Sequence, residues 1–420
     1  MDICKNRAYD LLKRMSFQRI AGTTEEKECA QLLLEECQKA GVDAYIEDFE
    51  IDMPLISKAY LEADGKTIPC IGVGKTGSCE DLEGEFLYVE NGLPVNFINA
   101  KDKIVILNGL MKPEIKKLMI KAGVKGIILT YGTLFDSEQM IKELRPRNQM
   151  EYEDDEKIPT LLIHITHAQE IIRNNTKQLK MTLIQDDEHK GTSHNVIATI
   201  KGSEYENEII SFSAHYDSVI YGKGAWDNAT GSVTIMELMH YFVAHPPKRT
   251  LKFIWCGSEE IGLVGSKKYC EMHEEELKNM VFNINVDMTG VVLGYDVAVC
   301  TCEKACADFI DYLGKIEGFP IETSVDTYSS DSTSFAMKGV PAMTFARLSP
   351  KGGAEIHNRR DTLEPLDAQV FINTVNFMSK FASHIVNASY FPVSKVLPDD
   401  IKEKLDKLDK MFNPKKKEVQ

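Results

Sequence analysis

Two histidines and three carboxylates follow one another in segments that are polar or rich in small residues: His215, Asp227, Glu260, Asp287 and His357. Imidazole nitrogen and carboxylate oxygen are both good zinc donors. Five such donors suit two divalent cations if one carboxylate bridges them. A metal pair of this kind lowers the pKa of a bound water and polarises a carbonyl group. These residues therefore favour hydrolysis of an acyl or peptide bond.

Three further features support this chemistry. Asp227 lies in a turn of small residues, where the backbone can bend a short carboxylate between two ions. Glu259 and Glu260 are adjacent, and neighbouring loop residues can point in different directions, so one can bind a metal while the other acts as general base. Asp217, two residues after His215, can hydrogen-bond the second ring nitrogen of that histidine and orient the ring.

Short apolar runs typical of strands come directly before most of these ligands. They are Glu208–Ala214 before His215, Leu251–Cys256 before the glutamate pair, Val281–Val286 before Asp287, and Val340–Ala346 before the loop that ends at His357. In open α/β sheets, sites form in the crevice outside the carboxyl ends of the strands. Ligands far apart in the sequence should therefore meet at one rim of a sheet.

Helical patterns alternate with these strands. The clearest cover Asn228–His245 and Gly265–Met280, each after a ligand-bearing loop. This alternation predicts an α/β fold with a largely parallel sheet and helices on both faces. The first 55 residues predict helix, helix and strand, with a capping box from Thr23 to Glu26 at the start of the second helix.

The length of 420 residues predicts one large domain and a smaller one. Apolar runs and helical pieces between residues 55 and 184 carry no cluster of ligand types, which indicates a separate, non-catalytic module. We therefore predict a discontinuous catalytic domain over 1–54 and 185–393, an insert over 55–184, and a C-terminal helix with a basic tail over 394–420.

Composition excludes some classes of partner. The net charge of -15 gives no footprint for nucleic acid and would be repelled by an anionic membrane. The amino terminus has no apolar signal-peptide core, and no stretch approaches the length of an apolar membrane span. We expect a soluble, cytoplasmic protein, and the sequence leaves its oligomeric state open.

The ten cysteines do not indicate a disulfide framework, because several lie in helix or buried-strand patterns that suit a reducing compartment. Cys300, Cys302 and Cys306 are clustered, but they are three thiols with no fourth ligand at zinc-finger spacing, which favours structural thiols over a metal site. The remaining histidines lack a ligand-like context and are predicted to be structural or surface residues: His164, His167, His189, His194, His240, His245, His273 and His384.

The ligand segments together resemble the signature of the co-catalytic di-zinc aminopeptidases, the family typified by aminopeptidase S and aminopeptidase Y. The matching segments are His215-Tyr216-Asp217-Ser218, Asp227–Gly231, Glu259–Ser266, Asp287-Met288 and Ile356–Thr362. The resemblance covers most of residues 193–385, and the opening around Arg19 and Ala21-Gly22-Thr23 is also similar.

The resemblance implies a phosphorylase/hydrolase-like, three-layer α/β/α fold with a mixed central sheet and two bound metal ions, Zn²⁺ above all. It implies a bridging role for Asp227, a first metal held by His215 and Asp287, and a second held by Glu260 and His357. It further implies that Glu259 is the general base and proton shuttle and that Asp217 is the partner of His215.

The insert is similar to the protease-associated domain of many such enzymes, which is thought to roof the active site and limit substrate size. Two departures from the family pattern stand out. Ser330-Asp331-Ser332 lacks the histidine of the family's Ser-Asp-His segment, and Ile356 precedes the final ligand where some relatives have a tyrosine. Tyr328 is the candidate for stabilising the oxyanion in place of that tyrosine.

The leading hypothesis is an exopeptidase that removes amino-terminal residues from peptides by water attack, with Glu259 as general base. A glutaminyl cyclase, a carboxypeptidase and an N-acyl-amino-acid deacylase on the same fold remain alternatives. Arg347, Arg359 and Arg360 lie near the final ligand and could hold a substrate carboxylate. A non-catalytic receptor-like or scaffold protein is the third class, although such descendants usually lose ligands and none is missing here.

Overall fold

The computed structural model describes residues 3–109, 111–145 and 157–412. The chain forms two compact units, which divide after Ile51 and again after Gly191. The N-terminal segment up to Ile51 and the residues from Thr192 to the end of the last described helix make the first unit, and Asp52–Gly191 makes up the body of the second. The sequence placed the insert at 55–184, and its assignment as a protease-associated domain stays a prediction.

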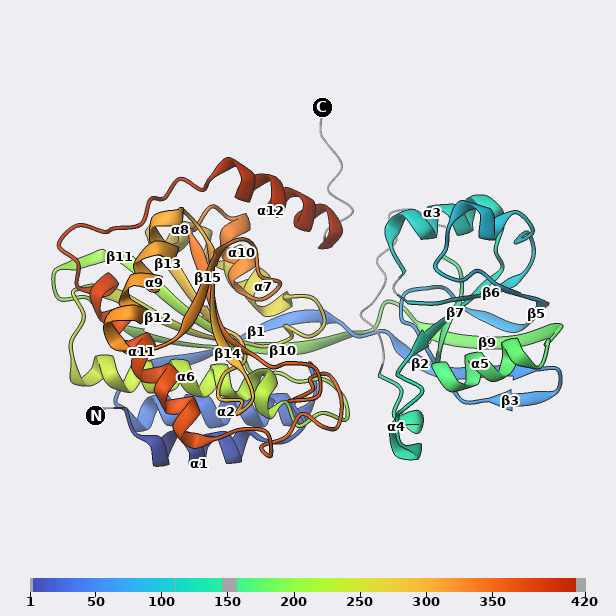
Figure 1. The fold of residues 1–420 in the computed structure, drawn as a ribbon, viewed down its shortest axis with the longest axis horizontal. Helices are drawn as coiled ribbons and strands as arrows, with labels where there is room; N and C mark the ends of the chain where they lie inside the picture. Colours follow the sequence, from blue (N-terminus) through green and yellow to red (C-terminus); the bar gives the residue numbers. More distant parts are fainter. Residues whose placement is uncertain (1–2, 110, 146–156, 413–420) are drawn as a thin grey trace. The chain divides into compact units, whose positions relative to one another are not determined.

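The first unit is built on an eight-stranded sheet (Figure 1), in the order β1-β10-β12-β11-β13-β16-β14-β15. Its four central strands run parallel: β12 (Arg249–Cys256), β11 (Tyr205–His215), β13 (Met280–Val286) and β16 (Ala342–Leu348). Antiparallel neighbours flank them, β10 (Lys190–Ile200) on β12 and β14 (Tyr295–Thr301) on β16. The remaining strands are β1 (Asp43–Asp52) and β15 (Ile321–Val325), the latter parallel to β14. The sheet is therefore mixed.

Helices cover both faces of this sheet. Successive residues of a strand point to opposite faces, so a strand that is apolar throughout presents apolar side chains to both layers of helices. In β11, Ile210 and Phe212 pack in the large core formed with α1 (Lys5–Met15), α2 (Thr24–Lys39), α6 (Thr230–Ala244), α9 (Lys304–Glu317) and α11 (Ala368–Val386). Ile209 faces the smaller core formed with α7 (Val264–Met272), α8 (Glu274–Leu277) and α10 (Ser332–Met337). The predicted three-layer α/β/α fold is confirmed.

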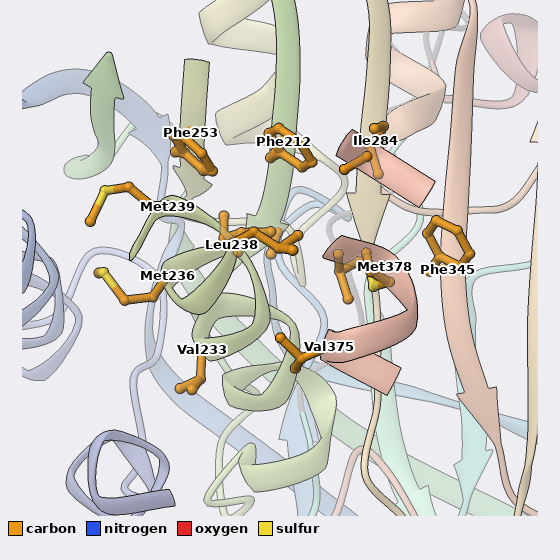
Figure 2. Packing of buried hydrophobic residues seen from close by; sticks show 14 of the residues in the cluster. Phe212, Val233, Met236, Leu238, Met239, Phe253, Ile284, Phe345, Val375 and Met378 are labelled. Atoms are coloured by element: carbon orange, nitrogen blue, oxygen red, sulfur yellow. The ribbon is translucent and has the colours of Figure 1, made fainter. Parts of the chain in front are cut away.

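The large core holds the ligand-bearing strands against the helices that follow them (Figure 2). Phe212 of β11 stacks on Phe253 of β12 with ring centroids 5.0 Å apart. Leu238 of α6 and Met378 of α11 pack in the same cluster. Fully burying one such side chain contributes roughly 1.5–3 kcal/mol to the free energy of unfolding. This packing therefore stabilises the strands whose ends carry the ligands.

The sequence prediction of one helix over Gly265–Met280 is wrong. The chain leaves helical geometry at His273, which has φ -115° and ψ 30°, and its ring nitrogen lies 2.8 Å from Glu47 Oε1 of β1. This tertiary contact separates α7 from α8. Met280 is buried at the start of β13, because the run that follows it belongs to the central sheet.

The predicted C-terminal helix is present as α12 (Asp399–Phe412), which packs on the first unit. Its Ile401 and Leu405 are buried with Ala336 of α10 and Ala342 of β16. The predicted basic tail lies outside the described residues.

The second unit has its own eight-stranded sheet, in the order β3-β2-β9-β5-β6-β7-β8-β4. Its strands are β2 (Leu55–Ala63), β3 (Lys66–Ile68), β4 (Cys70–Gly72), β5 (Cys79–Tyr88), β6 (Ile104–Leu107), β7 (Gly126–Tyr131), β8 (Thr160–His164) and β9 (Gln178–Asp186), with helices η1 (Pro94–Phe97), α3 (Pro113–Ala122), α4 (Glu138–Lys142) and α5 (Ile165–Arg173). Two buried clusters fill it. Among the described helices of the whole chain, none is both long and apolar enough to cross a bilayer.

Candidate metal centre

The carboxyl ends of the central parallel strands bring the predicted ligands together. His215 is the last residue of β11 and pairs with Cys256, the last residue of β12. The two glutamates follow β12, and Asp287 follows β13, with its N–H donating to Phe345 O of β16 at 3.0 Å. His357 comes from the loop after β16. The rim predicted from the strand pattern thus collects residues from four strand ends.

Two groups of possible metal ligands form at this rim, and they share one residue. The first comprises His215, Asp227 and Asp287, and the second comprises Asp227, Glu260 and His357. Within each group the ligand atoms lie within 4.8 Å of one another. Asp227 Oδ1 lies 3.2 Å from His215 Nε2, and its Oδ2 lies 3.1 Å from His357 Nε2. The two carboxylate oxygens therefore face different histidines, which is the arrangement that a bridging ligand needs.

The remaining ligands complete the two groups. Asp287 Oδ1 lies 3.7 Å from His215 Nε2, and Glu260 Oε2 lies 3.2 Å from His357 Nε2. His215, Asp227, Glu260 and Asp287 are buried, whereas the His357 side chain is 42% exposed. The second group is therefore the one that solvent reaches.

Asp217 connects the first histidine to the glutamate loop. Its Oδ1 lies 3.5 Å from His215 Nδ1 and accepts from the backbone N–H of Glu259 at 3.0 Å. Its Oδ2 accepts from the N–H of Glu260 at 3.1 Å. Asp217 is fully buried. Asp217 thus faces the histidine, as the sequence predicted, and it also holds the backbone of both glutamates. The sequence did not indicate this second role.

Glu259 is placed beside both groups. Its Oε2 lies 4.0 Å from His215 Nε2, and its side chain is 13% exposed. Burial raises the pKa of Glu259 well above its usual range, and although His215 opposes this, the carboxylates of Glu260 and Asp331 add to it. A carboxyl group with a raised pKa is suited to proton transfer.

Tyr328 lies close enough to the centre to be affected by its charges. Burial first, and then the carboxylates of Asp287, Asp227 and Glu259, raise the pKa of its phenol. The phenol therefore stays protonated and keeps an O–H to donate. Its role in oxyanion stabilisation stays a prediction.

Asn228 is a contributor that sequence reasoning missed. Its Nδ2 donates to Val286 O at 2.8 Å, and its Oδ1 accepts from Met288 N at 3.0 Å, so it holds both sides of the residue that follows β13. Its Oδ1 also accepts from Gly231 N at 2.9 Å. A Cβ atom at Gly231 would lie 2.4 Å from Val286 O, so only glycine permits this approach. The Asp-Asn dipeptide was the available signal.

Asp361 lies in the segment Ile356–Thr362 of the family resemblance, but the sequence assigned no role to it. Its two carboxylate oxygens accept from the backbone N–H groups of Trp226 and Asp227 at 2.8 and 3.2 Å. Burial raises the pKa of Asp361 to about 7, and the Asp227 carboxylate adds to this shift. Asp361 thereby fixes the backbone of the residue that faces both histidines.

Arg19 links the ligand loops to the N-terminal segment. Its guanidinium is fully buried and donates to the carbonyl oxygens of Tyr216, Lys223 and Gly224 at 2.5, 2.7 and 2.8 Å. These carbonyls belong to the loop after β11 and to the segment before Asp227. Five N–H donors in a rigid fork allow one arginine to hold both loops. The sequence marked Arg19 only through the family resemblance.

The charges of the centre fit two divalent cations. Six carboxylates are buried or nearly so around two imidazoles: Asp217, Asp227, Glu259, Glu260, Asp287 and Asp331. Asp287 Oδ1 is buried and accepts no hydrogen bond from the described residues. Buried charges are costly unless they are paired or coordinate metals. In the absence of cations, burial alone would lower the pKa of His357. The carboxylates of Asp227 and Glu260 outweigh burial and raise this pKa to about 9.

Comparisons by sequence agree with this geometry. The model of peptidase family M28 matches residues 195–382, which contain all five candidate metal ligands. The chain is 27% identical over 296 residues to aminopeptidase YwaD of Bacillus subtilis, covering 67% of this chain and 61% of that protein. It is 27% identical over 246 residues to carboxypeptidase Q of Xenopus laevis, covering 56% of this chain and 51% of that protein. The matches thus span between half and two thirds of these relatives.

The fold has close counterparts among solved structures. BSAP, a zinc aminopeptidase from Bacillus subtilis, superimposes with a TM-score of 0.77 at 22% identity, covering 95% of this chain and 99% of that one. This likeness shows the fold. The part of the chain that carries the five candidate ligands is the part that matches peptidase family M28.

Proposed function

We propose that the protein is a metal-dependent aminopeptidase, which hydrolyses the peptide bond after the first residue of peptides. The observation that carries this proposal is the position of Asp227, whose two carboxylate oxygens face the histidines of two separate ligand groups. The names of the relatives, aminopeptidase YwaD and the zinc aminopeptidase BSAP, support the same activity and zinc as the metal.

His215, Asp227 and Asp287 would hold one metal, and Asp227, Glu260 and His357 the other. Bound there, the metals would lower the pKa of water and polarise the scissile carbonyl. Asp217 keeps the imidazole of His215 in orientation and fixes the glutamate backbone through two hydrogen bonds.

Glu259 carries the proton in this proposal. Its carboxylate, beside His215 and facing both groups, accepts the proton of the attacking water and delivers it to the departing amine. The same carboxyl group can act as base in the first transfer and as acid in the second. The Tyr328 phenol, protonated because its pKa is raised, would donate to the developing oxyanion.

A carboxypeptidase is the second candidate, because carboxypeptidase Q is among the relatives. A carboxypeptidase needs a cation for the substrate carboxylate. Arg347 is committed elsewhere: its Nε donates to Val291 O at 2.7 Å and its Nη1 binds Asp296. Arg360 is paired with Glu355 at 2.6 Å. These contacts commit Arg347 and Arg360, two of the three arginines near the final ligand, to partners within the protein.

The test compares one short peptide in three forms: free, acetylated at the amino terminus, and amidated at the carboxyl terminus. We expect zinc-loaded protein to cleave the free and amidated forms from the amino end, and a chelator to abolish cleavage. Cleavage of the acetylated form would contradict the proposal and indicate deacylase or carboxypeptidase activity instead.

Variants connect this activity to the centre. Glu259→Gln should lower kcat by roughly 10²- to 10⁴-fold, the range for loss of a general acid–base group, with zinc content unchanged. Glu271→Gln is the matched control, because Glu271 is an exposed partner of Lys268 on α7. Equal activity of the two variants would overturn the role of Glu259.

A further inference from the structure

Three cysteines converge where strand β14 leads into helix α9. Cys300 lies near the end of β14, Cys302 follows the strand, and Cys306 lies in the first turn of α9. Residues two positions apart in an extended segment point to the same side. The chain then reverses direction and enters α9, where Cys306 N donates to Glu303 O at 3.2 Å. This turn brings the thiol of Cys306 next to the other two. The three sulfur atoms lie within 4.8 Å of one another.

This thiol cluster is separate from the metal centre. It shares no residue with either ligand group. Because β14 runs antiparallel to β16, Cys300 pairs with Met343 near the beginning of β16. The metal ligands instead follow the carboxyl ends of the parallel strands, where Val286 pairs with Phe345. The thiols therefore lie toward the other end of these strands.

The cluster also differs from the other buried cysteines of the chain. Cys29, Cys37, Cys256 and Cys270 are buried, but among the described residues none of them joins a group of three metal-ligating side chains. A single buried cysteine behaves as a small apolar residue. Three sulfurs within 4.8 Å of one another are instead a preformed set of soft donors.

The spacing and the number of donors define the class of ion. A metal bound to three sulfurs in a plane at about 2.3 Å would place those sulfurs about 4 Å apart, which this cluster can reach. No fourth donor belongs to the group among the described residues, so it lacks the tetrahedral set of a structural zinc site. Soft thiolates select Cu(I) and zinc, and Cu(I) readily accepts three-coordination.

Cys306 is suited to bind the ion first. It lies in the first turn of α9, where the helix dipole favours a thiolate. It is 5% exposed, whereas Cys300 and Cys302 are completely buried. The thiol at the start of the helix thus belongs to the least buried residue of the three.

We propose that Cys300, Cys302 and Cys306 form a three-thiolate site for one soft, thiophilic metal ion, for which Cu(I) is the best fit. Each thiol that joins the ion releases its proton to solvent, and no electron is transferred. The site is independent of the proposed peptidase activity, and its test does not rely on that activity.

The first test titrates reduced, zinc-loaded, full-length protein with Cu(I) under anaerobic conditions, against a chromogenic Cu(I) chelator. We expect one equivalent of Cu(I) per chain and a sulfur-to-copper charge-transfer band in the near ultraviolet. The variants Cys300→Ser, Cys302→Ser and Cys306→Ser should each lose this equivalent. Cys37→Ser is the matched control, because Cys37 is also buried but belongs to no group of three metal-ligating side chains among the described residues, and it should retain the equivalent.

A second measurement needs no substitution and remains valid if a serine variant fails to fold. Alkylation mapped by mass spectrometry should show that Cu(I) protects Cys306 in the wild-type protein and leaves the exposed Cys4 reactive. Absence of a charge-transfer band, equal loss of copper in Cys37→Ser, or a disulfide within the cluster in place of bound copper would each overturn the proposal. A third zinc equivalent that depends on the same three cysteines would support the site and identify zinc as its ion.

Discussion

The substitution Asp217→Asn tests how the glutamate loop is held at the metal centre. The aspartate accepts two backbone hydrogen bonds, from Glu259 at 3.0 Å and from Glu260 at 3.1 Å, and faces His215 Nδ1 at 3.5 Å. Asparagine has the same shape but only one acceptor oxygen, so one buried N–H group would face an NH₂ group. An unpaired buried donor costs about 1–3 kcal/mol, which we expect as lost stability of the metal-free protein.

The effect on metal binding is the sharper readout. Loss of a carboxylate that orients a metal-ligating histidine typically lowers metal affinity by about 10- to 100-fold. A loss of that size corresponds to about 1.4–2.7 kcal/mol of binding free energy. Zinc affinity is measured by competition with a fluorescent chelator, and stability by urea unfolding of the metal-free protein.

Asp48→Asn provides the control, because Asp48 also pairs with a histidine but lies outside the centre. Its Oδ1 lies 2.7 Å from His194 Nδ1, and its side chain is 67% exposed. This variant should bind zinc as the wild type does. If Asp217→Asn bound zinc as tightly as Asp48→Asn does, the reasoning that Asp217 orients the centre would be refuted.

Three further predictions concern other parts of the first unit. Burial lowers the pKa of His240 to about 4. The ordinary pKa of histidine is about 6.5, so between these two pH values the unfolded chain binds one proton more than the folded protein. The free energy of unfolding therefore falls by about 3 kcal/mol as the pH drops from 6.5 through 4. His240→Gln should remove this acid sensitivity in urea unfolding at several pH values, and an unchanged slope, or the same change in the exposed control His245→Gln, would contradict it. Gly231→Ala places a Cβ atom 2.4 Å from Val286 O, so it should cost about 1–3 kcal/mol through overpacking and lower zinc affinity by chelator competition; wild-type binding would show that the turn can relax. Phe253→Ala removes a buried stacked ring and should cost about 3–5 kcal/mol in urea unfolding; a loss below about 1 kcal/mol would show that the core refills the space.

The sequence was a good guide to the strands and to the ligands that follow them. A strand in the centre of a parallel sheet is buried on both faces, so its apolar run can be recognised locally. The polar residue after such a run lies at the carboxyl end of the strand, whatever the rest of the chain does. His215 and Asp287 could be placed at one rim for this reason.

Contacts between backbone and distant side chains could not be predicted in the same way. Asp361 accepts from the N–H of Trp226, and Arg19 donates to the carbonyl of Lys223, but any aspartate or arginine could make such bonds. Backbone donors and acceptors carry no residue-specific pattern, so the sequence does not show which pair will meet. The break of the predicted helix at His273 has a similar origin, since it accompanies a contact with Glu47 of another element.

The thiol cluster shows the same division. From spacing alone, Cys300, Cys302 and Cys306 are predicted to be structural thiols, because there is no fourth ligand at zinc-finger spacing. The turn from β14 into α9 brings their sulfurs within 4.8 Å of one another, a proximity that depends on the helix beginning immediately after the strand.

By itself, the sequence determined the α/β class, the order of the strands along the chain and the residue types available for metal binding, because these follow from local burial patterns and from side-chain chemistry. Only the tertiary structure decided that Asp227 faces two histidines at once and that Asp217 holds the backbone of both glutamates. The physical reason is that these distances are set by how four strand ends and three loops pack together, and no local segment of the chain contains that information.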